Sequence, residues 1–232
     1  MINSTIKVVA DENISGLEYF DRIAEVSRVH GRSLSAQEVH AADALLVRSI
    51  SSVNKELLDN SGVKFVASAT SGIDHVDMDY LLQSDIHFAH APGSNANSVV
   101  QYVFASLAFL SEKYNFDWRK LSVGIIGAGN VGSLLAQYLQ KLNINFVIYD
   151  PFLDERHPFS NTFASFETVL KQDLVTVHTP LTRKSLYPTW HLFDKAVLQS
   201  LDNDSMIINT SRGEVFDNQA LHLEYRQNSW KC

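Results

Sequence analysis

The sequence predicts an α/β protein built from two doubly wound parallel-sheet domains, and three observations support this fold class. Short apolar runs rich in β-branched residues alternate with helical patterns along the chain. A long helical pattern at 94–114 follows the turn "APG" and separates two such series. A glycine-rich motif, "GIIGAGNVGS", opens the second series. Because strands that alternate with helices form βαβ units, we expect parallel sheets in two domains, residues 1–95 and 96–232.

The first domain contains five apolar runs that fit strands, with helical stretches such as "NKELLDN" between them. The expected strands are 6–10, 25–30, 43–49, 64–69 and 86–90. This pattern predicts one doubly wound unit of the flavodoxin-like kind.

The pattern at 94–114 predicts a bridging helix whose start Ser94 or Asn95 can cap. The second series then contains four runs that fit strands, and each of them ends in a polar loop. These expected strands are 121–127, 145–150, 173–180 and 205–213. A strand, a glycine turn and a helix in this order predict a Rossmann domain.

Composition excludes several classes of protein. The formal net charge is −7 and no Lys/Arg cluster occurs, so we expect no nucleic-acid partner. No apolar run approaches the ~20 residues of a membrane helix, and the N-terminus does not resemble a secretory signal. Cys232 is the only cysteine, so an intrachain disulfide is impossible. We therefore expect a cytoplasmic protein that does not bind membranes.

Three glycines in the second series predict a dinucleotide site. Gly127 makes the tight turn, Gly129 lets the backbone approach a pyrophosphate, and Gly132 lets helix and strand pack closely. The helix that follows offers unpaired N–H groups, and we expect Asn130 and Val131 to donate to the phosphates. The alternative is a glycine turn that has only a structural role.

The next strand ends at Asp150, where a carboxylate can accept hydrogen bonds from the adenosine ribose. A carboxylate at this position repels the 2′-phosphate of NADP, so NAD is the expected cofactor, without a metal. The alternative is a solvated acid at the end of a strand.

Two later strands end in the loops "HTPLT" and "NTSRGEVFDNQAL". Ligands of open α/β sheets bind at the carboxyl ends of strands, and an Arg fork suits a carboxylate. Arg212 is therefore a candidate substrate contact, although it could instead pair with an acid such as Glu214. His178 is a possible general base, but a histidine at a strand end is more often structural, and His75 is equally ambiguous.

Two loops of the first domain, 48–53 and 68–75, place small polar residues after strands. Hydroxyls and free amides at the helix start near Asn54 would form an anion site, and Gly72 would let backbone N–H groups face a carboxylate. Each loop could instead be an ordinary capped turn.

Together these pieces resemble the D-isomer-specific 2-hydroxyacid dehydrogenases. The motifs that carry the resemblance span nearly the whole chain in order: "ADEN", "DALLVRS", "KFVASATSGIDHVD", "APGSNANSVVQYVFASL", "GIIGAGNVGS", "HTPLT", "TWHLFD" and "INTSRGEVFDNQAL". The motifs "VRS", "ATSGIDHVD" and "APGSNA" resemble the family members that oxidise 4-phospho-D-erythronate to 3-hydroxy-2-oxo-4-phosphooxybutanoate. Members of this kind use NAD in pyridoxal 5′-phosphate (vitamin B6) biosynthesis.

The resemblance also implies roles for individual residues. It implies that Ser49 and Thr70 bind the substrate and that Arg212 is catalytic. The NAD contacts that it implies are Asn130, Val131, Asp150, Thr179, Thr210, Ser211 and Arg212, beside the glycines 127, 129 and 132.

The family completes its active site with a Glu–His pair C-terminal to the "RG" loop, and neither residue has a counterpart before Cys232. The resemblance therefore implies a C-terminally truncated sequence, an incomplete second domain and an inactive fragment of an enzyme that is a homodimer at full length. Two alternatives stay open, namely another D-2-hydroxyacid dehydrogenase and a non-catalytic NAD-binding module.

Overall fold

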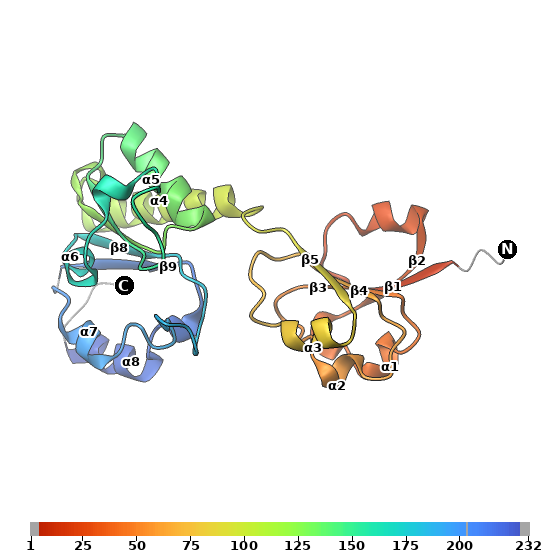
Figure 1. Ribbon diagram of the computed structural model, residues 1–232. Coiled ribbons are helices and arrows are strands. Elements are labelled where there is room, and N and C mark those ends of the chain that lie inside the picture. Colours follow the sequence, from red (N-terminus) through yellow and green to blue (C-terminus); the bar gives the residue numbers. More distant parts are fainter. Residues whose placement is uncertain (1–4, 203, 228–232) are drawn as a thin grey trace. The chain divides into compact units, whose positions relative to one another are not determined.

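The computed structural model describes residues 5–202 and 204–227, and the chain divides into two compact units, Met1–Ser94 (unit 1) and Asn95–Cys232 (unit 2) (Figure 1). Each unit has its own sheet, and every pair of neighbouring strands in these sheets runs parallel. Parallel sheets bury both faces, and each unit accordingly builds its own apolar core.

The sheet of unit 1 has the strand order β2-β1-β3-β4-β5, which is the flavodoxin-like order. Its strands are β1 (Ile6–Asp11), β2 (Ala24–Val29), β3 (Ala44–Val47), β4 (Phe65–Ser68) and β5 (His87–His90). The strand order reverses between β1 and β3, so the loops after these two strands lie beside the crevice where such sheets bind ligands.

One face of this sheet is covered by three short helices, α1 (Ala36–Val39), α2 (Lys55–Leu58) and α3 (Met78–Gln83). Their buried residues Val39, Leu57 and Leu81 belong to one apolar cluster. Leu17 from the 3-10 helix η1 (Leu17–Arg22) joins a second cluster, and η1 lies across the sheet from α1–α3 (Figure 1). A further 3-10 helix, η2, spans Gly31–Ser33.

The sheet of unit 2 has the order β7-β6-β8-β9. Its strands are β6 (Val123–Ile126), β7 (Phe146–Tyr149), β8 (Leu174–Val177) and β9 (Met206–Asn209). A parallel bridge from Ile148 to Phe163 adds a one-residue strand outside β7. In chain order this arrangement is 3-2-1-4-5, the order of a Rossmann sheet, and it reverses between β6 and β8.

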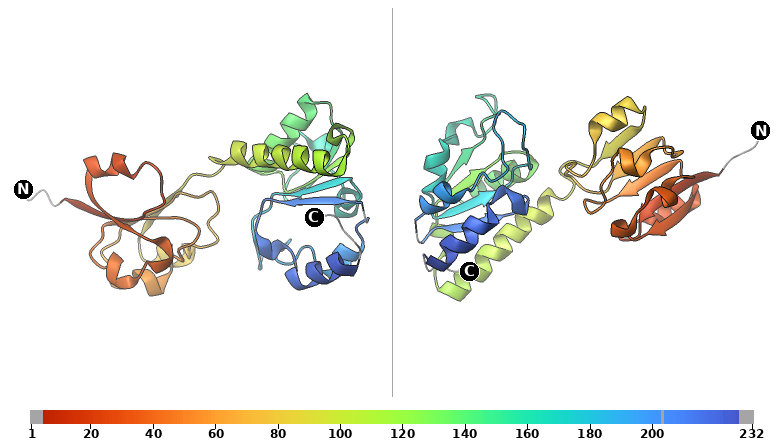
Figure 2. Two further views of the ribbon diagram at one scale, coloured as in Figure 1. Left: turned by 180° about the vertical axis from the view of Figure 1, so that it is seen from behind. Right: turned by 90° about the horizontal axis from the view of Figure 1, so that it is seen from below.

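Helices cover both faces of this second sheet (Figures 1 and 2). The helices α4 (Ala96–Tyr114) and α5 (Asn130–Lys141) share one apolar cluster, which includes Leu107 and Leu135. The other face carries α6 (Phe166–Leu170), α7 (Lys195–Gln199) and α8 (Asn218–Gln227). Three 3-10 helices complete the unit: η3 (Trp118–Lys120), η4 (Ser160–Thr162) and η5 (Gly213–Val215).

The predicted fold class is confirmed, because all strands lie within or next to the expected apolar runs. Asn95 is the N-cap of α4, but its side chain makes no capping hydrogen bond to that helix.

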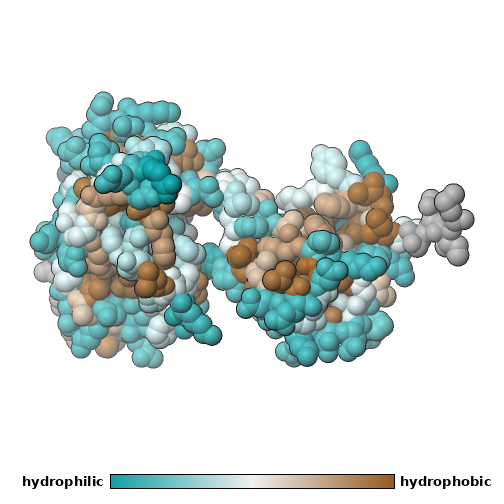
Figure 3. All heavy atoms as spheres, viewed as in Figure 1, coloured by the Kyte–Doolittle hydropathy of each residue, from teal (hydrophilic) through white to brown (hydrophobic). Residues whose placement is uncertain are grey.

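In the part of the chain that the structure describes, no helix combines the length and apolar character that crossing a bilayer requires. On the face that Figure 3 shows, hydrophilic atoms alternate with smaller hydrophobic areas on both units.

Candidate functional site

The glycine motif forms a tight loop between β6 and α5. Gly127 has a φ of 87°, a conformation that glycine adopts at little cost. A Cβ on Gly132 would overlap the Gly127 carbonyl oxygen, so this glycine lets α5 approach β6 closely. A Cβ on Gly129 would meet no heavy atom within 4 Å. The backbone at Gly129 therefore faces open space that a ligand can enter.

The first turn of α5 is open to an anion. Gly129 is the N-cap and provides no side-chain cap, and Asn130 and Val131 are the first two helical residues. Amides in the first turn of a helix have no acceptor within the helix, and they lie at the positive end of its dipole. These amides can donate to a phosphate group.

The carboxylate of Asp150 follows β7 and is fixed by two backbone bonds. Its Oδ2 accepts from the Ala128 N–H at 2.9 Å and its Oδ1 accepts from the Phe152 N–H at 3.1 Å. The first bond ties the end of β7 to the glycine loop. Each oxygen still has a lone pair, so the carboxylate can accept from a hydroxyl brought to this edge of the sheet.

Two buried hydroxyls in the neighbouring loops lack hydrogen-bond partners. They are Thr179 Oγ1, after β8, and Ser211 Oγ, after β9. Buried hydroxyls are normally paired, and an orphaned one in a native structure points to a ligand, water or ion that would pair with it. Together with the open side of Gly129 and the fixed Asp150, these two atoms fit a dinucleotide that runs along the carboxyl edge of the sheet.

His178 is held in a closed network. The Thr210 hydroxyl donates to the Val177 carbonyl oxygen at 3.1 Å and therefore accepts from His178 Nδ1 at 2.6 Å. His178 Nε2 then accepts from the Thr176 hydroxyl at 2.9 Å. Burial lowers the pKa of His178 to about 4. Both ring nitrogens are engaged and the ring is neutral, so we assign His178 a structural role.

Arg212 lies in a turn that begins at the end of β9. Asn209 Oδ1 accepts from the Ser211 N–H at 2.9 Å, and Asn209 Nδ2 donates to the Arg212 carbonyl oxygen at 3.0 Å. The Arg212 carbonyl oxygen also accepts from the Val215 N–H at 3.2 Å. The Glu214 carboxylate accepts from Arg183 at 2.8 Å. The loop thus fixes the Arg212 backbone at the carboxyl edge, where ligands of such sheets bind.

In unit 1, Ser49 is exposed in the turn after β3, beside the point where the strand order reverses. Its neighbour Arg48 lies 4.0 Å from Asp11, a buried carboxylate at the end of β1. The second carboxylate oxygen of Asp11 is buried and has no hydrogen-bond partner. A half-buried cation beside Ser49 can attract an anionic ligand group.

At the start of the next helix the structure shows a capped turn, which was the alternative to an anion site formed by free amides. Asn54 caps that helix itself, because its Oδ1 accepts from the Leu57 N–H at 3.0 Å. Helix α2 is also only four residues long, so it contributes little dipole. The positive charge of this loop comes from Arg48, which the sequence singled out only as part of the "VRS" motif.

Thr70 belongs to a hydroxyl cluster after β4. Ser68 Oγ lies 2.8 Å from Thr70 Oγ1 and 3.1 Å from His75 Nε2. Thr70 Oγ1 also donates to the Gly72 carbonyl oxygen at 3.3 Å. His75 therefore takes part in the network that fixes Thr70.

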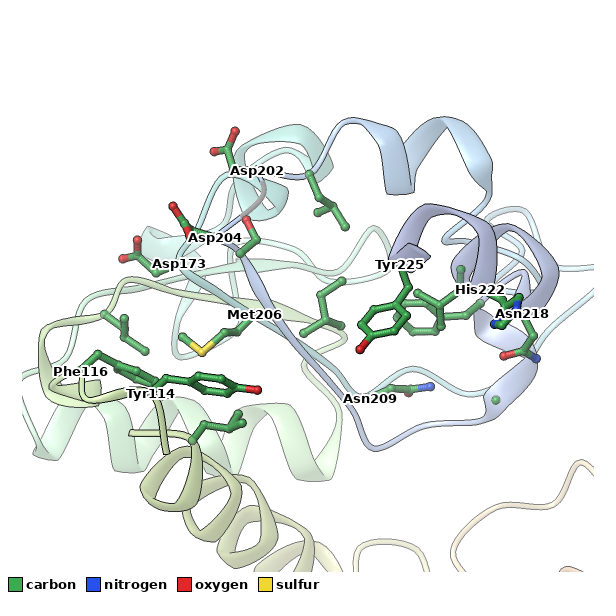
Figure 4. Close-up of a pocket in the computed structure, with 18 residues that line it drawn as sticks. Tyr114, Phe116, Asp173, Asp202, Asp204, Met206, Asn209, Asn218, His222 and Tyr225 are labelled. Carbon is green, nitrogen blue, oxygen red and sulfur yellow. The ribbon is translucent and has the colours of Figure 1, made fainter. Parts of the chain in front are cut away.

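A groove of about 820 Å³ follows the outer edge of β9 (Figure 4). Aromatic and aliphatic side chains line its middle, including Tyr114, Phe116, Met206 and Tyr225, and Asp173, Asp202 and Asp204 lie at one end. Its lining contains none of the residues expected to contact NAD. The groove is therefore a feature separate from the nucleotide site.

Comparison with known proteins places this geometry in a family. Residues 108–230 match the NAD binding domain of the D-isomer specific 2-hydroxyacid dehydrogenases. The chain is 45% identical to the erythronate-4-phosphate dehydrogenase of Hahella chejuensis over 93% of its own length and 56% of that protein. The corresponding protein of Photorhabdus laumondii is 43% identical, over 93% of this chain and 58% of that protein. The chain thus spans somewhat more than half the length of these curated relatives.

Solved structures share the fold at low sequence identity. One is an NAD-bound 3-phosphoglycerate dehydrogenase of Entamoeba histolytica, with a TM-score of 0.80 and 21% identity over 97% of this chain and 78% of that one. Another is an NAD-dependent formate dehydrogenase of Staphylococcus aureus, with a TM-score of 0.80 and 23% identity over 97% of this chain and 79% of that one. At these identities the similarity establishes the fold alone.

Proposed function

The chain belongs to the D-isomer specific 2-hydroxyacid dehydrogenase family and carries its NAD-binding domain. On this premise we propose that it is part of an enzyme that oxidises 4-phospho-D-erythronate to 3-hydroxy-2-oxo-4-phosphooxybutanoate. The observation that carries the NAD-dependent part of the proposal is the carboxyl edge of the unit 2 sheet, with the Gly129 loop, the Asp150 carboxylate and two unpaired buried hydroxyls. The substrate is the one that the names of the relatives indicate. The proposal includes a role in vitamin B6 biosynthesis, a cytoplasmic location and a homodimer for the whole protein.

In this proposal NAD, when bound, would accept the hydride from the substrate carbon, and the hydroxyl proton would pass to a general base of the whole enzyme. The amides of Asn130 and Val131 hold the pyrophosphate, and Asp150 accepts from the adenosine ribose. The hydroxyls of Thr179 and Ser211 satisfy their hydrogen-bonding capacity on the cofactor. Thr210 supports the site through His178.

The proposed substrate contacts comprise one residue of unit 2 and three residues of unit 1. Arg212 binds the substrate carboxylate with its planar fork and orients the reacting carbon. Ser49 and Thr70 bind the rest of the acid, and Arg48 provides positive charge beside Ser49 for the phosphate. Each of these four roles is part of the proposal, and those of Ser49, Arg48 and Arg212 are each tested by a substitution.

The cofactor assignment is tested by calorimetric titration of the chain with NAD and NADP. NAD is expected to bind more tightly, and Asp150→Ala should weaken NAD binding about tenfold while leaving NADP binding nearly unchanged. The matched control is Asp154→Ala, which removes an exposed carboxylate four residues away. Equal affinity of the unaltered chain for NAD and NADP would contradict the proposed contact between Asp150 and the adenosine ribose.

The substrate assignment is tested by titrating the NAD-loaded chain with 4-phospho-D-erythronate and with D-erythronate, which lacks the phosphate. Ser49→Ala and Arg212→Lys should each weaken binding of the phosphorylated acid several-fold, and Arg48→Ala should remove most of the preference for it. Ser52→Ala, in the same loop and also exposed, is the control. A chain that binds both acids equally well would refute the phosphate assignment but not the NAD site. In the whole protein the same substitutions should lower NADH formation with this substrate.

A further inference from the structure

The loop that follows β8 carries three stacked side chains, Arg183, Trp190 and His191, which we name the 183–190–191 stack. We propose that this stack is a positioning device for Arg212. The inference rests on the proposed role of Arg212 in binding the substrate carboxylate. None of the three residues is expected to touch substrate or cofactor.

The stack is built from close ring contacts. The Trp190 indole and the His191 imidazole lie 3.7 Å apart between centroids at an angle of 13°. The Arg183 guanidinium lies 4.7 Å from the centroid of the Trp190 ring. A cation over an indole and a parallel imidazole are both favourable arrangements, so the three groups hold one another in place.

The stack binds the segment that directly follows Arg212, through contacts with Glu214 and Asp217. The His191 N–H donates to the Glu214 carbonyl oxygen at 2.9 Å, and Arg183 bonds the Glu214 carboxylate at 2.8 Å. The His191 imidazole also lies 4.0 Å from the Asp217 carboxylate. Glu214 is therefore held through both its backbone and its side chain.

A buried pair of phenylalanines fixes the loop that follows β8 against the loop that follows β9. Phe193 and Phe216 are both buried and stack with centroids 4.2 Å apart at 11°. The Phe193 N–H donates to the Val215 carbonyl oxygen, and the Asp217 N–H donates to the Phe193 carbonyl oxygen, each at 3.0 Å. Because the Val215 N–H in turn donates to the Arg212 carbonyl oxygen, a shift of the stack is transmitted to the Arg212 backbone.

The loop that carries the stack is itself closed and locally strained. Thr182 and Thr189 bond each other through backbone and hydroxyl groups, which fixes the two ends of residues 182–189. His191 has a φ of 53°, which is uncommon for a residue other than glycine. Such a conformation persists when its surroundings enforce it.

The test measures the rate at which phenylglyoxal modifies Arg212 in the full 232-residue chain, with the adduct assigned to Arg212 by proteolytic digestion and mass spectrometry of the peptides. Trp190→Ala, His191→Ala and Arg183→Ala should each raise that rate about two- to fivefold, the factor that corresponds to one lost cation–π contact. Trp190→Phe and Arg183→Lys should restore most of the original rate. The control is Arg119→Ala, because Arg119 also lies over a tryptophan, 4.8 Å from the Trp118 ring, far from Arg212 in the sequence.

A second measurement connects the stack to ligand binding. The three alanine variants should weaken binding of 4-phospho-D-erythronate to the NAD-loaded chain about as much as they raise the modification rate, with the affinity for NAD unchanged. An unchanged Arg212 modification rate in all three variants, or an equal rise in Arg119→Ala, would overturn the inference. If the rate rises but the unaltered chain binds no phosphorylated acid, the stack still positions Arg212 and the substrate proposal alone fails.

Discussion

At the scale of single residues, His178 shows how one side chain links stability to pH. Its ring is neutral in the folded chain because burial lowers its pKa to about 4, whereas an unperturbed histidine has a pKa near 6.5. As the pH falls from about 6.5 to about 4, the unfolded chain binds this proton before the folded chain does. The free energy of unfolding therefore falls across this window, by at most about 3 kcal/mol from this one group.

The prediction is that His178→Gln flattens this dependence. Urea unfolding at several pH values between 7 and 4 should show a smaller loss of stability in the variant than in the unaltered chain. His222→Gln, which changes an exposed histidine of the same unit, should keep the original slope. If the slopes of the unaltered chain and His178→Gln coincide, His178 is not held neutral in the fold.

At the scale of elements, the junction of β6 and α5 separates a packing glycine from a binding glycine. Gly132→Ala places a Cβ on the Gly127 carbonyl oxygen, so the helix must move. We expect a loss of about 1–3 kcal/mol in the free energy of unfolding, as for other overpacked sites. Gly129→Ala has open space around its Cβ, so the loss should stay below about 1 kcal/mol while NAD affinity falls more than tenfold.

Chemical denaturation together with NAD titration checks both glycine variants. The informative result is the contrast, since each variant is the control for the other. A Gly129→Ala chain that binds NAD normally would show that the pyrophosphate does not approach this part of the backbone.

Elements with a strong local pattern could be predicted from the sequence, and contacts between distant loops could not. The strands were predictable because buried parallel strands appear as apolar runs, and the glycine motif follows such a run directly at Ile126. The sequence left an anion site and a capped turn open at Asn54, because only the fold shows that Asn54 bonds its own helix. The unpaired hydroxyl of Thr179 has no sequence signal, since its burial depends on neighbouring loops. The stacking of Trp190 on His191 also has no sequence signal, since the motif "TWHLFD" does not show how the two rings lie.

At the scale of the whole molecule, the two units have separate cores, and the two tryptophans among the described residues, Trp118 and Trp190, belong to unit 2. Tryptophan fluorescence therefore reports the unfolding of unit 2, while far-UV circular dichroism reports both units. A ligand that binds only the folded state of one unit stabilises that unit by about 2.7 kcal/mol at a hundred times its Kd. Because the proposed NAD contacts all lie in unit 2, NAD should raise the fluorescence midpoint in urea. It should also split the circular dichroism curve into two transitions, the earlier of which is independent of NAD. Coincident curves that shift together with NAD would show instead that the two units unfold as one cooperative body.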